Sequence, residues 1–269
     1  MSAGLPHRRD LATAVAARHN ELMRSLQELP ATRLHERSLL PGWSRLTVLC
    51  HLRYGAEASR SMTEETMAAR PTSFYPEGRS QQRPRTLEPR PGENAGDILR
   101  SLTEACASLD RTWDELDDDA WTMTVVEPAD NVDLGPISLW SLALFRLTEV
   151  EVHGSDLDIG LADWSDTFVA AALPTRLKML ETRRSNHGTV DESVSGTWAF
   201  NIDGRTSYTI AAVGSDVTVA HGDAHADTTF AGTGHQILGF LLGRTALDEL
   251  EVRGNHELAA RWRTAFPPP

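Results

Sequence analysis

The spacing of apolar residues changes once along the chain, and this change constrains the fold more than any other feature of the sequence. Up to Arg183, apolar residues recur at intervals of three and four, which is typical of amphipathic helices. From Ser195 onward they alternate with polar residues, which is typical of half-buried strands. The pattern predicts an α+β protein of two domains, with a helical domain over residues 1–183 and a smaller α+β domain over residues 184–269.

Long segments with helical spacing predict a four-helix bundle in the first domain. They run over residues 11–29, from 45 to before Pro71, 98–116 and 139–153. Ser44 can cap the second helix, and Gly154 is expected to terminate the fourth. Because the helices follow one another with loops between them, we expect an up-and-down order. Residues 71–91 are rich in proline and carry no apolar period, so they are predicted to form a long loop.

The second domain contains a strong hairpin signal. Asp203-Gly204 separates two alternating segments, Ser195 to Ile202 and Thr206 to Ala212, and such a dipeptide favours a two-residue turn. Further short strands are predicted over residues 217–220, 226–230 and 250–252, with a helix after the capping Thr233 and a last helix from Asn255.

Composition excludes several kinds of partner. A net charge of -12 and a pI near 5.3 disfavour nucleic acid, since no stretch of Lys and Arg interleaved with aromatic residues offsets the acidic charge. The longest largely apolar run, residues 134–147, is shorter than the roughly 18 residues that cross a bilayer, so we expect no membrane span. The amino terminus lacks the apolar section of a secretory signal, so we expect a cytoplasmic protein. Two cysteines, Cys50 and Cys106, are too few for a disulfide scaffold or a cysteine-built metal site.

The segment from Glu149 to His153 is the part of the sequence best suited to bind a metal ion. Residues four apart lie on one face of a helix, so Glu149 and His153 can bind one ion, whereas Glu151 points roughly 160° away. The candidate third ligand is His51, which follows a turn-forming Pro-Gly-Trp segment. Two histidines and one carboxylate leave coordination positions open for water or substrate, as in catalytic zinc sites. A surface ion pair between Glu149 and His153 is the alternative interpretation of this spacing.

Residues near these candidates are expected to have structural roles. Cys50 lies about 100° around the helix from its histidine neighbour, so we expect it, like Cys106, to pack in the core rather than to act as a nucleophile. Asp156 and Asp158 are expected to cap the turn that follows the fourth helix. Trp43 is expected to pack in the core or at its rim.

Two motifs follow one another along the chain. They are Leu40-Pro41-Gly42-Trp43-Ser44 followed by Leu49-Cys50-His51-Leu52, and Arg146-Leu147-Thr148-Glu149-Val150-Glu151-Val152-His153 followed by Asp156-Leu157. Together with Tyr75-Pro76 to Gln82-Arg83, Ala162-Asp163-Trp164 and Leu241-Leu242-Gly243-Arg244, they extend over almost the whole chain. In these residues the sequence resembles the mycothiol-dependent maleylpyruvate isomerases of the DinB-like superfamily. The motifs recur in relatives with different substrates, so they specify the chemistry better than the substrate.

The resemblance implies a DinB-like four-helix domain followed by a sterol-carrier-like α+β domain. It implies that His51, Glu149 and His153 bind a divalent metal ion, with zinc as the expected ion, although iron(II), nickel and manganese accept the same ligands. Arg83 and Arg244 match positions expected to face the cleft and to bind carboxylates of the substrate or of the thiol cofactor. The alternative for both arginines is a solvated surface position.

The resemblance also implies a reaction in which the metal deprotonates mycothiol and the thiolate attacks a small electrophile. The expected activity is the cis–trans isomerisation of maleylpyruvate or a related mycothiol S-transfer in detoxification or natural-product biosynthesis. The sequence departs from the family at Gly154, where many relatives have a second histidine. Because of this departure, the resemblance does not specify which substrate the protein takes. A non-catalytic binding module for small molecules and a metal-dependent hydrolase that activates water remain as alternatives.

Overall fold

The structure is a computed structural model that describes residues 8–186, 191–222 and 225–268. It divides into two compact units, one up to Phe168 and one from Val169 onward. This division lies earlier in the chain than the boundary at residue 183 that the sequence suggests. The reason is that helix α6 (Asp166–Asn186) packs with the second unit, where its Glu181 carboxylate accepts a hydrogen bond of 2.9 Å from the backbone N–H of Val219.

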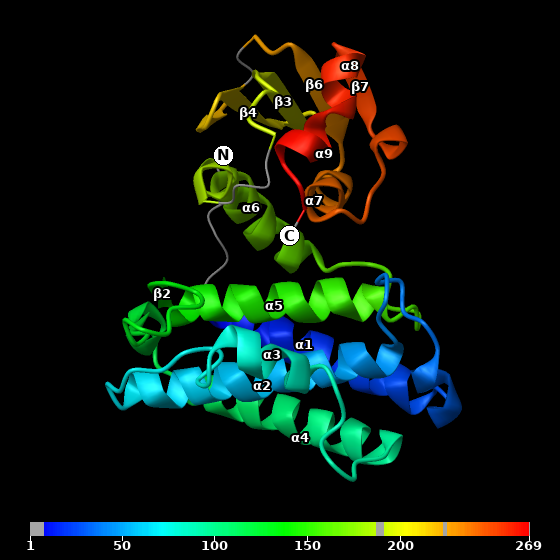
Figure 1. Ribbon diagram of the computed structural model, residues 1–269, viewed down its shortest axis with the longest axis vertical. Coiled ribbons are helices and arrows are strands. Elements are labelled where there is room, and N and C mark those ends of the chain that lie inside the picture. The colour runs from blue at the N-terminus through cyan, green and yellow to red at the C-terminus, as the bar shows by residue number, and fades with distance from the viewer. Residues whose placement is uncertain (1–7, 187–190, 223–224, 269) are drawn as a thin grey trace. The chain divides into compact units, whose positions relative to one another are not determined.

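The first unit is the predicted four-helix bundle, built from α1 (Arg8–Gln27), α2 (Arg45–Met67), α4 (Ala95–Asp114) and α5 (Leu139–Asp156) (Figure 1). Each helix turns an apolar stripe to a common core, which includes Leu22 of α1, Leu52 of α2, Leu109 of α4 and Leu147 of α5, all fully buried. Side-chain caps start three of the helices at Ser44, Asn94 and Ser138. The unit also holds two short 3-10 helices (Ala31–His35 and Ala120–Thr122) and a two-stranded sheet, β1 (Thr124–Val125) with β2 (Ile137–Ser138), that the apolar pattern did not predict.

The order of the helices differs from the expected up-and-down arrangement. Both α1 and α2 pack on α4 and on α5, so α1 and α2 lie diagonally opposite each other. Two hydrogen bonds give the direction of α2 against α4: Arg53 donates to Ser101 at 3.0 Å, and ten residues later Thr63 accepts one from Trp113 at 2.9 Å. The two helices therefore run parallel, and the chain between them must return along the length of the bundle.

The returning segment is residues 68–94, and it contains a helix where a loop was predicted. Helix α3 (Arg79–Thr86) begins after Gly78, whose positive φ of 87° turns the chain into the helix. None of its residues is buried. A helix without a buried face has no apolar period, which is why the hydrophobic pattern did not indicate it.

The fourth helix of the bundle continues past the residue expected to end it. Gly154 keeps a helical backbone, and the N–H of Leu157 still bonds to the carbonyl of His153 at 3.2 Å. A terminating glycine adopts a positive φ, which Gly154 does not. A Cβ at Gly154 would lie 3.7 Å from the Arg18 guanidinium, so the glycine sits where α5 approaches α1.

The second unit is a five-stranded sheet with helices, so the α+β class is confirmed. The strand order is β5-β4-β3-β6-β7, with β3 and β6 parallel and the other pairs antiparallel. The strands are β3 (Gly196–Ile202), β4 (Thr206–Val213), β5 (Asp216–His221), β6 (Thr228–Gly232) and β7 (Glu251–Gly254). The predicted hairpin between β3 and β4 is confirmed, and Asp203 and Gly204 both adopt positive φ angles, of 53° and 63°. Ile202 pairs with Thr206, however, so the loop has three residues rather than the expected two.

Aromatic side chains form the core of the second unit. Phe200 of β3 and Phe230 of β6 contact Phe240 of α7 (Gly234–Leu242) and Trp262 of α9 (Trp262–Ala265). Thr233 caps α7, as expected from the sequence, and Asn255, from which a last helix was predicted, caps α8 (His256–Ala260). The 3-10 helix Leu247–Glu249 links α7 to β7.

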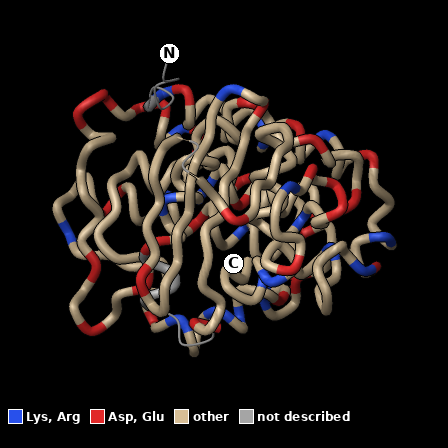
Figure 2. The backbone as a smooth tube through the Cα atoms, turned by 90° about the horizontal axis from the view of Figure 1, so that it is seen from above, with Lys and Arg blue, Asp and Glu red and all other residues tan. Residues whose placement is uncertain are grey.

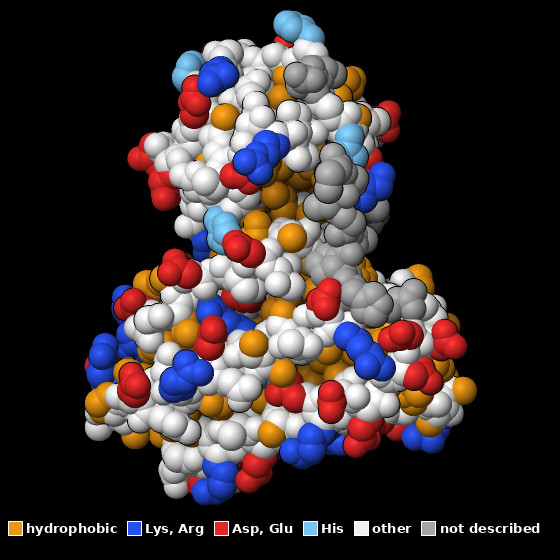
Figure 3. Space-filling view, turned by 180° about the vertical axis from the view of Figure 1, so that it is seen from behind, with side chains coloured by type: hydrophobic (Ala, Val, Ile, Leu, Met, Phe, Trp, Pro, Cys, Tyr) orange, Lys and Arg blue, Asp and Glu red, His pale blue; other side chains and the backbone are white. Residues whose placement is uncertain are grey.

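Charges of both signs are distributed along the chain. Figure 2 shows Lys and Arg interspersed with Asp and Glu, and on the face of the helical unit in Figure 3 the two kinds of charged side chain lie next to each other. No described helix is long and apolar enough to cross a membrane.

One buried ion pair fixes the end of α5 in the helical unit. Arg18 Nε of α1 lies 3.0 Å from Glu151 Oε2, and the two side chains are 7% and 1% exposed. Arg18 Nη2 also donates to the carbonyl of Leu161 at 2.9 Å, and Ser165 Oγ donates to Glu151 Oε1 at 2.5 Å. The pair thus joins α1, α5 and the segment that follows α5.

We expect Glu151→Gln to destabilise the protein by about 3–5 kcal/mol, because it removes the buried counter-charge of the Arg18 guanidinium and leaves only the half-exposed Glu21 as its partner. Urea unfolding followed by circular dichroism measures the loss. The matched control is Glu21→Gln, which removes the half-exposed second partner of Arg18. This control should cost less than about 1 kcal/mol, and equal losses in the two variants would contradict the assignment.

Candidate metal centre

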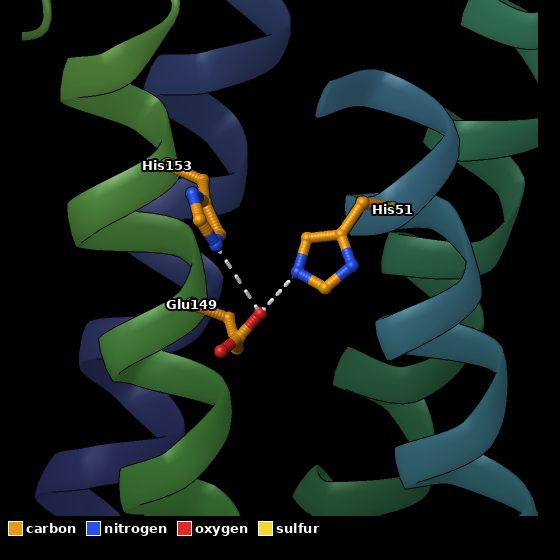
Figure 4. A group of neighbouring side chains, drawn as sticks. All are labelled: His51, Glu149 and His153. Carbon is orange, nitrogen blue, oxygen red and sulfur yellow. Dashed lines mark hydrogen bonds and ion pairs between the residues drawn. The ribbon is translucent and has the colours of Figure 1, made fainter. Parts of the chain in front are cut away.

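The side chains of His51, Glu149 and His153 converge between α2 and α5 (Figure 4). His51 Nε2 lies 2.5 Å from Glu149 Oε2, and His153 Nε2 lies 3.6 Å from the same oxygen. One ligand atom from each residue lies within 4.8 Å of the others, and this is the one such group of His, Cys, Asp and Glu in the described part of the chain. The structure therefore brings together the three residues that the sequence offered as metal ligands.

The helices are joined close to these ligands. Arg45, the first residue of α2, is buried, and its Nε donates a hydrogen bond of 2.7 Å to the carbonyl of Leu157 at the end of α5. The hydroxyl of Ser44 accepts the Thr47 N–H and so fixes where α2 begins. With α2 and α5 antiparallel and joined there, His51 lies opposite the one-turn pair Glu149 and His153.

The electrostatic environment keeps Glu149 ionised. Burial alone raises the pKa of this carboxyl, but the hydrogen bond from His51 and the positive charges of His51, His153 and Arg146 outweigh it and lower the pKa to about 2. A carboxylate that persists far below neutral pH is the form that binds a cation.

His153 has an orienting partner, and His51 does not have one among the described residues. Asp156 Oδ2 lies 2.9 Å from His153 Nδ1, which leaves His153 Nε2 turned toward Glu149. Such carboxylate–histidine pairs fix the ring of a metal-ligating histidine. Asp156 was expected to cap a turn, and it lies instead within α5 in this contact. His51 Nδ1 is buried and makes no hydrogen bond.

Arg146 is a neighbour of the site that the sequence interpretation missed. It lies one turn before Glu149 on α5, and its buried guanidinium donates to the carbonyl of Leu52 on α2 at 2.9 Å and to His19 Nε2 on α1 at 3.0 Å. Gly55 makes room for it, since a Cβ there would lie 2.9 Å from Arg146 Nη1. The arginine thus joins α1, α2 and α5 one helical turn from Glu149. Its position in the Arg-Leu-Thr-Glu motif was the available signal.

The ring of Trp43 packs beside the rings of both histidines. Its ring centroid lies 5.5 Å from that of His51 and 6.2 Å from that of His153. The turn that carries it is set by Gly42, which has a φ of 81°, and is attached to α5 through the Leu39 N–H, which donates to the Asp156 carbonyl at 2.8 Å. Trp43 is half-buried, so it packs at the rim as expected, but its place against the two rings gives it a part in the site.

Of the two candidate arginines, Arg83 lies beside Trp43, whose ring neighbours both histidines. Its guanidinium carbon is 5.8 Å from the centroid of the Trp43 ring, and this side chain makes no hydrogen bond or ion pair with other residues that the structure describes. Arg244 belongs to the second unit, where its Nη1 donates to the carbonyl of Leu242 at 2.7 Å. Its expected role in binding a carboxylate stays a prediction.

The cysteines and Glu151 lie where the sequence indicated. Cys50 and Cys106 are buried. Burial raises the pKa of the Cys50 thiol to about 11, which is unfavourable for a nucleophile. Glu151 faces away from the centre and pairs with Arg18. Neither cysteine is part of the ligand group.

Comparisons with known proteins agree with this description. The family model of the mycothiol maleylpyruvate isomerase N-terminal domain matches residues 15–158. The crystal structure of the mycothiol-dependent maleylpyruvate isomerase superposes with a TM-score of 0.69 at 19% identity, covering 92% of this chain and 93% of that chain. An alanine mutant of that enzyme gives the same TM-score at 18% identity. No curated protein matches the chain by sequence.

At these identities the superposition shows a shared fold, while the family model spans the bundle helices that carry His51, Glu149 and His153. Because this match covers more than half of the sequence, the chain belongs to the mycothiol maleylpyruvate isomerase family, as the resemblance in its motifs implied.

Proposed function

We propose that this protein is a metal-dependent enzyme that uses mycothiol as a nucleophile, and that it isomerises maleylpyruvate or transfers mycothiol to a related small electrophile. The observation that carries the proposal is the convergence of His51, Glu149 and His153 around one point, with Glu149 held as a carboxylate. Membership of the family supports the choice of mycothiol. Since the reaction needs the reduced thiol, we propose the cytoplasm as its compartment.

The donor set fits a divalent metal ion. Two imidazole nitrogens and one carboxylate oxygen are a combination found in catalytic zinc sites, where a fourth position stays open. A divalent ion in this position, with zinc as the proposed ion, would lower the pKa of the mycothiol thiol and so supply a thiolate at neutral pH. The contact with Asp156 orients His153 for this purpose, and the carboxylate of Glu149 offsets part of the positive charge.

The chain itself supplies a binding group for an anionic substrate. The Arg83 guanidinium has five N–H donors, none of which is used within the described structure, and it lies over the ring of Trp43, the neighbour of both histidines. A guanidinium binds a carboxylate through two parallel hydrogen bonds, so Arg83 can hold one carboxylate of a dicarboxylic substrate such as maleylpyruvate. Trp43 excludes water from this side of the site.

The proposed reaction proceeds by addition and elimination. The sulfur of mycothiol forms a bond to one carbon of the cis double bond, and the displaced electron pair moves to the conjugated carbonyl as an enolate, which Arg83 stabilises by its charge. Rotation then takes place about the resulting single bond. The electron pair returns, the carbon–sulfur bond breaks, and fumarylpyruvate and the thiolate are released. In an S-transferase the electron pair would instead expel another leaving group, and sulfur would stay on the product.

Metal content tests the ligand assignment. We expect about one divalent ion per chain in the purified protein and loss of that ion in His51→Ala, Glu149→Ala and His153→Ala, because each removes a ligand. Elemental analysis after dialysis measures the content, with circular dichroism to verify folding. His35→Ala, an exposed histidine of the same unit, is the matched control and should keep the ion. Full retention in the three ligand variants would refute the site.

Turnover tests the reaction. Metal-loaded protein with mycothiol should consume maleylpyruvate, and the activity should disappear with a chelator or without the thiol. The absorbance of maleylpyruvate and the mass of any S-conjugate are followed together. A stable conjugate would select the transferase, turnover in thiol-free buffer would select a hydrolase, and metal binding without any turnover would favour a binding module.

Substrate affinity tests Arg83. We expect Arg83→Ala to raise KM for the dicarboxylate roughly tenfold or more, since it removes a charged hydrogen-bonding partner of the substrate. The matched control is Arg85→Ala on the same helix, whose guanidinium pairs with the exposed Glu77. Steady-state kinetics of both variants measure the effect, and an equal KM in the two variants would contradict the role of Arg83.

A further inference from the structure

Helix α3, which carries Arg83, is held in place by contacts at its ends. None of its residues is buried, so it does not gain position from an apolar face. The guanidinium of Arg83 makes one described contact, over the Trp43 ring. The location of that guanidinium therefore depends on the contacts that fix the crossover segment, residues 68–94.

At the end of the segment that follows α3, two charged pairs join it to α2. Arg90 Nη2 lies 2.6 Å from a carboxylate oxygen of Glu57, and Arg53 Nη1 donates to both oxygens of Glu93 at 2.8 and 2.9 Å. Arg53 is buried. These contacts hold the chain after α3.

At the end that precedes α3, the side chain of Asn131 makes three hydrogen bonds to the segment. The Asn131 amide nitrogen donates to Ser73 Oγ at 2.8 Å, to the carbonyl of Tyr75 at 2.8 Å and to the carbonyl of Pro76 at 3.2 Å. The carbonyl of Tyr75 in turn accepts the N–H of Gly78, the residue after which α3 begins. Asn131 thus binds the backbone that sets the start of the helix.

The loop that carries Asn131 is itself fixed by its own contacts. The Glu127 carboxylate accepts the backbone N–H groups of Asp133, Leu134 and Gly135, the last at 2.7 Å. Asp133 also pairs with Arg79, the first residue of α3, at 3.0 Å. Because the loop is braced in this way, a contact from it can hold another segment in position.

The same backbone is connected to the metal centre through aromatic rings. The ring of Tyr75 stacks on that of Tyr54 at a centroid distance of 5.2 Å, and Tyr54 lies one turn after His51 on α2. The Tyr54 hydroxyl donates to the carbonyl of Phe74 at 2.5 Å. The segment before α3 is therefore fixed against the helix that supplies a metal ligand.

We propose that Asn131 is a positioning residue that sets where the Arg83 guanidinium lies at the metal centre. The inference rests on the role of Arg83 in the proposed function. Asn131 lies in the β1–β2 loop and touches none of the three candidate metal ligands. Under this inference it nevertheless controls the affinity for the anionic substrate.

Kinetics of a double-mutant cycle test the proposal, with mycothiol and maleylpyruvate as the probes. Asn131→Ala should raise KM for maleylpyruvate about tenfold, lower kcat no more than Arg83→Ala does and leave the metal content unchanged. In the Arg83→Ala background the same substitution should have no further effect on KM. Asn131→Asp, which keeps the size but loses the N–H donors, should behave like Asn131→Ala. Val132→Ala, an exposed residue of the same loop, is the matched control and should leave KM unchanged.

Hydrogen exchange gives a readout that does not depend on activity. The amides of residues 79–87 should exchange faster in Asn131→Ala than in Val132→Ala, while those of α2 and α5 should be unchanged. A raised KM in Arg83→Ala with an unchanged KM in Asn131→Ala would overturn the inference alone, as would effects of the two substitutions that multiply. An unchanged KM in Arg83→Ala would contradict the role of Arg83 in the proposed function. It would also contradict the inference about Asn131, which rests on that role.

Discussion

The parallel packing of α2 on α4 is the constraint on which the rest of the helical unit depends. Two parallel neighbours cannot be joined by a short turn, so residues 68–94 must return along the outside of the bundle. On the way this segment stacks Tyr75 on Tyr54 and carries Arg83 to the Trp43 ring. A connection that the topology requires has therefore become the part of the chain that brings a positive charge to Trp43, the neighbour of both candidate ligand histidines.

The ligand group depends on a second, antiparallel contact, between α2 and α5. Two buried arginines join these helices through backbone carbonyls: Arg45 from α2 to Leu157, and Arg146 from α5 to Leu52. A guanidinium that is buried must use its donors, so each arginine fixes the spacing of the helices more strictly than apolar packing does. His51 and Glu149 lie between these two connections, and their separation follows from them.

Sequence patterns predicted the elements that are determined by interactions between residues close together in the sequence. Helical spacing gave the bundle helices, and it placed Glu149 and His153 on one face, while Asp203-Gly204 indicated the hairpin. His51 was named as the candidate third ligand from its place after the Pro-Gly-Trp turn and was then supported by the family motif, because no local rule brings together residues of different helices. The features that were wrong or missed depend on tertiary contacts. Helix α3 buries nothing, Gly154 continues a helix that packs on Arg18, and the helix order depends on the length of a connection.

Cys50 precedes His51 in sequence, and its burial has a consequence for a protein that works with a small thiol. With its pKa raised to about 11 by burial, the Cys50 side chain is a thiol rather than a thiolate at neutral pH. Mixed disulfides form by attack of a thiolate, so the burial and the raised pKa of Cys50 both disfavour S-thiolation of this residue.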